Sequence, residues 1–195
     1  MAIIELNGGD EAWRMWKTQQ AERLLELVTH APRRLSVFRL DLTSDFRAVI
    51  NLCAPMPMDT GRHSHVDRAA ITASSVIEVH CPQTVLDSPI ACDQWLSIIH
   101  PAHDLLHPHI GDGPQYLWTG HTVTSQANLA DLVVAAWSVI TMQPGLGFRA
   151  PGGPGVLNQH AADYWLTQTH RLPLLGDNDF SDSPFLRGLV SRPRR

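Results

Sequence analysis

The spacing of apolar residues along the chain changes from helical to alternating and then back to helical. Between residues 10 and 30 the apolar face of a helix is marked by positions three and four apart, namely Trp13, Trp16, Gln20, Leu24, Leu27 and Val28. Asp10 suits the start of such a helix as its N-cap, and Pro32 ends it because proline restricts the residue before it. The pattern therefore predicts an N-terminal helix over 10–30.

Four β-rich segments follow this helix. RLSVFRLDL and FRAVINLCA, joined by the turn Thr43-Ser44-Asp45, are predicted to form a hairpin. After a polar loop over 55–69 that contains proline and glycine, AITASSVIEVHCP predicts a third strand and CDQWLSIIHP a fourth. Because consecutive strands with short connections usually pair with their neighbours, we expect an antiparallel meander.

Two further helices are predicted after an irregular segment that contains HPH. An apolar stripe predicts a helix over 126–142, with Thr124 or Ser125 as its cap; the stripe consists of Leu129, Leu132, Val133, Ala136, Trp137 and Ile140. A glycine- and proline-rich loop over 143–155 leads to Asn158, which is suited to cap a last helix in QHAADYWLTQTHR. Strands in one run with helices outside it indicate an α+β fold.

Composition and charge narrow the class of protein. The 195 residues are 44% hydrophobic and 17% charged, which favours one globular domain over 1–175 with a tail over 176–195. A net charge of −4 gives no basis for broad nucleic-acid binding. The sequence shows no signal peptide and no apolar stretch of membrane length, so we expect a cytoplasmic protein. The spacing of Cys53, Cys81 and Cys92 is not paired, so we expect no disulfide framework.

One short stretch carries most of the candidate chemistry. LLHPHIGDGPQYLWTG, over 105–120, sets His107 and His109 around one proline, followed by a glycine-rich turn and Tyr116. With the order of the elements, this stretch resembles the ubiquitin-conjugating enzyme family. That family has an N-terminal helix, a four-stranded meander, an H-P-N tripeptide and then Gly-x-Ile-Cys-Leu, whose cysteine carries ubiquitin as a thioester.

The resemblance runs from about Asp10 to Leu175. The matching motifs are His107-Pro108-His109 for H-P-N and Gly113-Pro114-Gln115-Tyr116-Leu117 for Gly-x-Ile-Cys-Leu. VLNQHAADYWLTQTH is similar to the family's Pro-Leu-Asn-x-x-Ala-Ala-x-x-Tyr helix, and with THRLP after it looks most like bacterial members found in ubiquitin-like conjugation operons. The resemblance implies a ubiquitin-conjugating-enzyme-like fold.

This sequence departs from the family pattern at the positions that carry the family's chemistry. Tyr116 occupies the cysteine position and His109 the asparagine position, as is also seen in catalytically inactive variants that bind ubiquitin or peptide motifs without carrying ubiquitin. A phenol, with a pKa of about 10, is less available as the anion than a thiol but leaves more easily than an aliphatic hydroxyl. Tyr116 is thus interpreted either as a packed aromatic or as a carrier that forms an oxyester.

A tyrosyl carrier needs a base within hydrogen-bond reach. The candidates by proximity in sequence are His109, His107 and His121. His109 is also a candidate donor to a developing oxyanion, and HPH could instead be a structural turn, which is the role we expect for His107. Secondary nucleophile candidates, each also typical of turns and caps, are Thr119, Thr122, Thr124 and Ser125.

A metal site is the alternative hypothesis. The chain has 11 histidines, and imidazoles with one carboxylate are ligands that zinc accepts. The potential ligands are His63 and His65 in HSH, with His100, His103, Asp104, His107 and His109 in HPAHDLLHPH. Against a cupin-like metal site, the sequence has no glutamate or histidine at the usual spacing after HSH, and two long helices follow the predicted sheet.

The sequence therefore predicts a component of a bacterial ubiquitin-like conjugation pathway, acting in antiviral defence by family analogy. The expected partners are a ubiquitin-like protein, an activating-enzyme homologue and another conjugating enzyme, with no cofactor, nucleic acid or membrane. The N-terminal helix, with Arg14, Lys17 and Arg23 on its polar side, is where the family meets its activating enzyme, although such charges are also typical of a solvated face.

Overall fold

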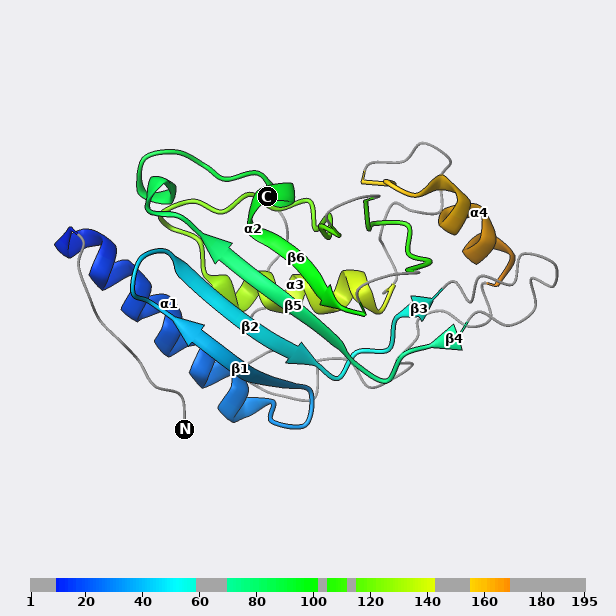
Figure 1. Ribbon diagram of the computed structural model, residues 1–195, viewed down its shortest axis with the longest axis horizontal. Helices are drawn as coiled ribbons and strands as arrows, with labels where there is room; N and C mark the ends of the chain where they lie inside the picture. The colour runs from blue at the N-terminus through cyan, green and yellow to red at the C-terminus, as the bar shows by residue number, and fades with distance from the viewer. Residues whose placement is uncertain (1–9, 59–69, 102–104, 112–114, 143–154, 169–195) are drawn as a thin grey trace.

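The computed structural model describes residues 10–58, 70–101, 105–111, 115–142 and 155–168. The elements are α1 (Glu11–His30), β1 (Leu35–Asp41), β2 (Phe46–Leu52), β3 (Pro57–Met58), β4 (Ala70–Ile71), β5 (Ser75–Cys81), η1 (Gln83–Leu86), α2 (Cys92–Trp95), β6 (Leu96–His100), α3 (Leu129–Ile140) and α4 (Gln159–Thr167). The architecture is α+β: an N-terminal helix, a four-stranded antiparallel sheet in the order β1-β2-β5-β6, and C-terminal helices (Figure 1). Among the described residues, no helix is long and apolar enough to cross a bilayer.

The N-terminal helix is confirmed together with its cap. The Asp10 carboxylate accepts a hydrogen bond from the Ala12 N–H at 3.2 Å, and the helix gives way at Ala31, just before Pro32. One prediction for this helix is wrong, because Lys17 is buried and does not lie on a solvated face. Its ammonium group donates to the carbonyls of Leu42 and Ser44, and burial lowers its pKa. Lys17 therefore fastens α1 to the β1–β2 turn.

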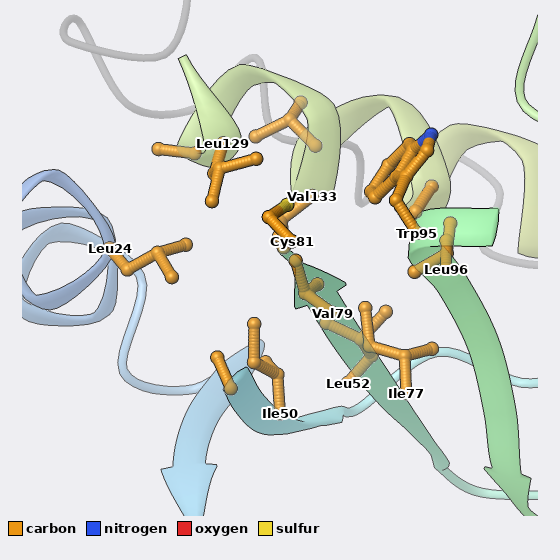
Figure 2. Close-up of a cluster of buried hydrophobic side chains, with 14 of the residues drawn as sticks. Leu24, Ile50, Leu52, Ile77, Val79, Cys81, Trp95, Leu96, Leu129 and Val133 are labelled. Carbon is orange, nitrogen blue, oxygen red and sulfur yellow. The ribbon is translucent and has the colours of Figure 1, made fainter. Parts of the chain in front are cut away.

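The meander places an apolar face of the sheet against α1 and α3. In β2 and β5 every second residue is buried, which is the alternation of a sheet with one covered face. Figure 2 shows Ile50, Val79 and Val133 converging in this core, with Leu24 of α1 nearby. The predicted hairpin is confirmed, since β1 pairs with β2 from Leu35↔Leu52 to Asp41↔Arg47.

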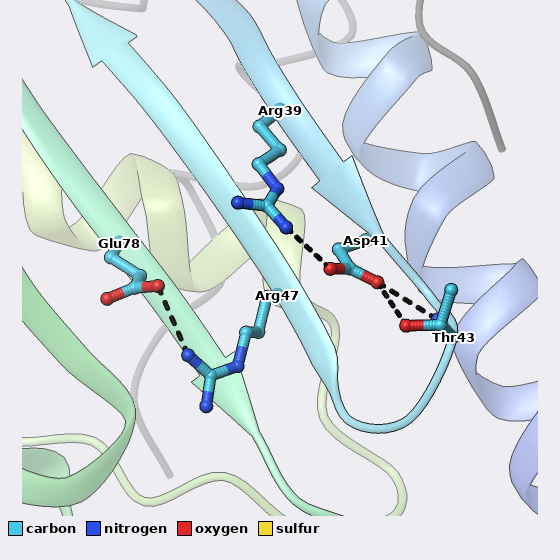
Figure 3. A network of polar contacts seen from close by, with 5 residues as sticks. All are labelled: Arg39, Asp41, Thr43, Arg47 and Glu78. Carbon is cyan, nitrogen blue, oxygen red and sulfur yellow. Dashed lines mark hydrogen bonds and ion pairs between the residues drawn. The ribbon is translucent and has the colours of Figure 1, made fainter. Parts of the chain in front are cut away.

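The opposite face of the sheet carries charged side chains (Figure 3). Arg39 lies 2.8 Å from Asp41, and Arg47 lies 3.8 Å from Glu78 on the neighbouring strand. The hydroxyl and N–H of Thr43 both donate to Asp41, and these bonds hold the pKa of that carboxyl down, at about 2. We refer to this side of the sheet as the outer face.

The structure corrects three predicted boundaries before the HPH segment. The loop predicted over 55–69 contributes β3, which pairs with β4, and the rest of it from 59 lies outside the described residues. The third predicted strand is therefore split, with β4 in a small second sheet and β5 in the main one. The fourth begins later than predicted, because CDQW forms the helical turn α2.

The cap of α3 was also predicted wrongly. Asn128, not Thr124 or Ser125, caps the helix, since its side-chain oxygen accepts from the Ala130 N–H at 3.1 Å. The Asn158 cap of α4 is confirmed, with its side-chain oxygen 2.9 Å from the Ala161 N–H. The tail predicted over 176–195 and most of the 143–155 loop lie outside the described residues.

Candidate functional site

The HPH segment and the Tyr116 segment extend the main sheet beyond β6. Tyr116 bridges to Ser97 of β6, with the Ile98 N–H donating to the Gln115 carbonyl at 2.7 Å. On its other side the Tyr116 segment pairs with the residues that follow HPH, through the antiparallel bridge Ile110↔Leu117; we call these residues the HPH strand. Tyr116 thus belongs to a short strand with a neighbour on each side.

Alternation along these short strands sorts the side chains onto two faces. Leu117 and Ile110 are buried in the main core, on the covered face. The Trp118 N–H donates to the His109 carbonyl, which sets those two residues opposite each other, and Tyr116 is two residues from Trp118. Tyr116, Trp118 and His109 therefore share the other face of this hairpin, with Tyr116 and His109 as diagonal neighbours, an arrangement that aromatic side chains can bridge.

Gly111 provides the surface on which Tyr116 rests. The N–H of Gly111 donates to the Tyr116 carbonyl, so the two residues lie opposite each other in the hairpin. A Cβ added to Gly111 would lie 2.7 Å from Cε1 and Cζ of the tyrosine ring and 3.0 Å from its hydroxyl. The ring therefore covers the glycine backbone, as aromatic residues do when they shield a glycine in a neighbouring strand. The Tyr116 side chain remains partly exposed.

His107 is fully buried and both of its ring nitrogens are bonded to the backbone. Nε2 lies 3.0 Å from the Val139 carbonyl of α3 and must donate to it, while Nδ1 accepts from the His109 N–H at 3.1 Å. Burial is the main cause that lowers the pKa of His107 to about 3, with the nearby His109 adding to it. The ring is therefore neutral with its proton on Nε2, which favours the structural role expected for it.

His109 is held in the opposite tautomer. Its Nδ1 lies 2.9 Å from the Gly155 carbonyl, and because a carbonyl only accepts, Nδ1 carries the proton. Burial lowers the pKa of His109, and the bond to Gly155 opposes that effect. A neutral ring protonated on Nδ1 has its lone pair on Nε2, which suits an acceptor of protons and not an oxyanion donor.

The α4 region closes over the HPH segment. The N–H groups of Leu157 and Asn158 both donate to the Pro108 carbonyl, and Trp165 donates from Nε1 to the Leu106 carbonyl at 2.7 Å. The rings of His109 and Trp118 stack with centroids 5.7 Å apart. These contacts immobilise the HPH backbone between α3, α4 and the Tyr116 strand.

The backbone of His121 is bonded to Trp95 and Thr119. Its carbonyl accepts from Nε1 of Trp95 at 3.2 Å, and its N–H donates to the Thr119 hydroxyl at 3.4 Å. Thr124 and Ser125 accept backbone or indole N–H groups through their carbonyls, from Ala127 and Trp16. The residues around 119–125 thus form the connection to α3, as their turn-like types indicate.

The metal hypothesis falls largely on residues outside those described, namely His63, His65, His103 and Asp104. Among the residues that the structure does describe, no group of three or more histidine, cysteine or acidic side chains could hold a metal ion. Cys53 is exposed at the end of β2, and Cys81 is buried in β5, where burial raises the pKa of its thiol to about 12. Neither belongs to the strands that pair with Tyr116.

Sequence reasoning missed three residues of this site: Gly111, Trp118 and Gly155. Trp118 was two positions from Tyr116 and so detectable by strand alternation, once 115–118 is taken as a strand. Gly155 is distant in sequence, and only the hydrogen bond to His109 brings it to the site. A comparison with protein-family models, with curated proteins and with solved structures finds no match to this chain.

Proposed function

We propose that this chain is a ubiquitin-conjugating-enzyme-like component of a bacterial ubiquitin-like conjugation pathway, in which Tyr116 carries the modifier as an oxyester. The proposal rests mainly on one observation: Tyr116 and His109 share one face of the hairpin, and His109 is oriented by Gly155. Covalent transfer uses a nucleophile, a base within hydrogen-bond reach of it and a group that orients the base, so the proposal requires the Tyr116 hydroxyl to reach Nε2 of His109 during the transfer. The α+β order of elements and the resemblance in the sequence support the family.

The hydroxyl oxygen of Tyr116 attacks the C-terminal carbonyl carbon of a modifier that an activating-enzyme homologue holds as a thioester. A C–O bond forms, the C–S bond breaks, the phenol proton goes to Nε2 of His109, and the thiolate stays on the activating enzyme. An amine of the target then attacks the ester carbonyl: a C–N bond forms, the C–O bond to Tyr116 breaks, Nε2 of His109 returns its proton to the phenolate oxygen, and the proton that the amine loses passes to solvent.

A non-catalytic variant of the same fold is the second candidate function. It is favoured by the contact between Tyr116 and Gly111, because an aromatic ring that shields a glycine has a structural purpose of its own. In that case the chain binds the ubiquitin-like protein, the activating enzyme or a true conjugating enzyme without forming a bond to any of them.

An intact-mass measurement separates the two functions. The chain is incubated with ATP, a ubiquitin-like protein and the activating-enzyme homologue encoded by the same genome, and compared with Tyr116→Phe and Tyr164→Phe. The two tyrosines are the only ones in the sequence, so Tyr164→Phe is a matched control. A carrier gives an adduct that hydroxylamine removes, that persists in Tyr164→Phe and that is absent in Tyr116→Phe.

Two results would reject the carrier function. The absence of any adduct, with folded protein and an active activating enzyme, would leave only the binding function. An adduct that persists in Tyr116→Phe would move the acceptor to another side chain, and peptide mapping would identify it.

A further inference from the structure

The His109 ring contacts Gly155 and Trp118, and both contacts depend on Gly155. The ring donates from Nδ1 to the Gly155 carbonyl at 2.9 Å and stacks on Trp118. Trp118 itself lies directly over Gly155, since a Cβ built there would approach its ring atoms to 2.0 Å. Gly155 therefore supports the histidine both directly and through the indole.

We infer that Gly155 is a positioning residue for the proposed transfer, because its carbonyl fixes the proton of His109 on Nδ1 and so keeps the lone pair on Nε2. This inference rests on the proposed function, in which Nε2 takes the proton of Tyr116. An imidazole in solution exchanges its proton between the two nitrogens, and the protein must select one form for a base to act reliably.

Glycine is required at this position for two separate reasons. Its φ of 76° lies in the left-handed region, which residues with a Cβ rarely adopt. A side chain would also collide with Trp118, whose Cε3, Cδ2 and Cζ3 atoms would all lie within 2.3 Å of the Cβ. Gly155→Ala should therefore displace Trp118, the carbonyl or both, and release the His109 ring.

The tautomer is measured directly by long-range ¹H–¹⁵N correlation of the histidine rings in the full chain at neutral pH. In the native protein we expect His109 protonated on Nδ1 and His107 protonated on Nε2. In Gly155→Ala we expect His109 to show averaged or Nε2-protonated signals, with His107 unchanged because its partners are Val139 and the His109 N–H. Native His109 protonated on Nε2, or charged, would overturn the inference.

A second variant covers the case in which Gly155→Ala does not fold. The double variant Trp118→Ala with Gly155→Ala removes the collision together with the stack of Trp118 on His109, and leaves the backbone strain of the alanine. We expect it to restore the Nδ1 proton of His109. If either folded variant with alanine at 155 keeps the native tautomer while its carbonyl bond is lost, Gly155 does not determine the tautomer.

The rate of adduct formation on Tyr116 tests the link to the transfer. Loss of the oriented base should slow adduct formation in folded Gly155→Ala by about 100-fold or more. An unchanged rate with an altered tautomer would overturn the inference. No adduct in the native protein, with the expected tautomer present, would instead reject the proposed carrier and leave the structural part of the inference intact.

Discussion

At the scale of single residues, the two histidines of HPH differ in which nitrogen carries the proton. His107 donates from Nε2 to α3, and His109 donates from Nδ1 to Gly155. The sequence identified both residues as candidates, and strand propensity alone could not assign their tautomers. The tautomer of His107 depends on a carbonyl group 32 residues away in the chain, and that of His109 depends on one 46 residues away.

The buried His107 should make the protein sensitive to acid. Its folded-state pKa is about 3, whereas an unfolded chain binds this proton near pH 6.5. Because the unfolded state binds more protons between those values, the unfolding free energy falls as the pH is lowered through that interval. Above about pH 6.5 neutral His107 makes its full contribution to the unfolding free energy. Below that pH the unfolding free energy falls by up to ~1.4 kcal/mol per pH unit.

Urea unfolding between pH 7 and pH 4.5 measures this slope. His107→Gln should reduce the pH dependence of the unfolding free energy by the equivalent of up to one bound proton, even if the variant is less stable at every pH. His160→Gln, which changes an exposed histidine of α4, is the control and should keep the native slope. An equal slope in all three proteins would contradict a neutral, buried His107.

Tyr116 and Gly111 should be energetically coupled. Gly111→Ala forces a methyl group to within 2.7 Å of the tyrosine ring and should destabilise the fold by about 1–3 kcal/mol. In a Tyr116→Ala background that ring is absent, so the same substitution should cost about 1 kcal/mol less. Thermal unfolding of the four proteins of this double-mutant cycle gives the coupling, and an equal cost in both backgrounds would refute the contact.

At the scale of elements, the start of α3 depends on a residue of α1. The Gln20 side chain accepts from the Leu129 N–H at 2.9 Å and donates to the Ala127 carbonyl at 2.9 Å. The sequence placed Gln20 on the apolar face of the first helix, but a contact across 109 residues is not visible in a local pattern. The predicted cap of α3 was wrong for a related reason, since the side chains of Asn128 and Gln20 accept hydrogen bonds from N–H groups of the first turn.

Gln20→Ala should therefore destabilise the protein by about 2 kcal/mol or more, because it leaves a buried N–H and a partly buried carbonyl without the bonds that Gln20 provides. The adjacent Gln19 is exposed, and Gln19→Ala should change the unfolding free energy by less than about 0.5 kcal/mol. The denaturant midpoints of the two variants, compared at a constant m-value, measure both changes in unfolding free energy. Similar midpoints for the two variants would contradict the role of Gln20.

At the scale of the whole molecule, the order of elements was largely predictable. A change of apolar period from helical to alternating distinguishes α1 from the strands, and short connections make the meander the natural pairing. Pairing of the HPH strand with Tyr116 was not predictable, because glycine- and proline-rich segments give no period. The covered face and the outer face follow from alternation in β2 and β5.

We propose that this chain acts in a ubiquitin-like conjugation pathway, and the carrier function requires it to bind the modifier, the activating enzyme or a complex of the two. The most direct test is isothermal titration of the native chain with the ubiquitin-like protein and with the activating-enzyme homologue encoded by the same genome. We expect saturable binding of at least one of them, with a Kd in the micromolar range or tighter, which corresponds to a binding free energy of about −8 kcal/mol or more negative. No binding of either protein at millimolar concentrations, with all three folded, would contradict the carrier function.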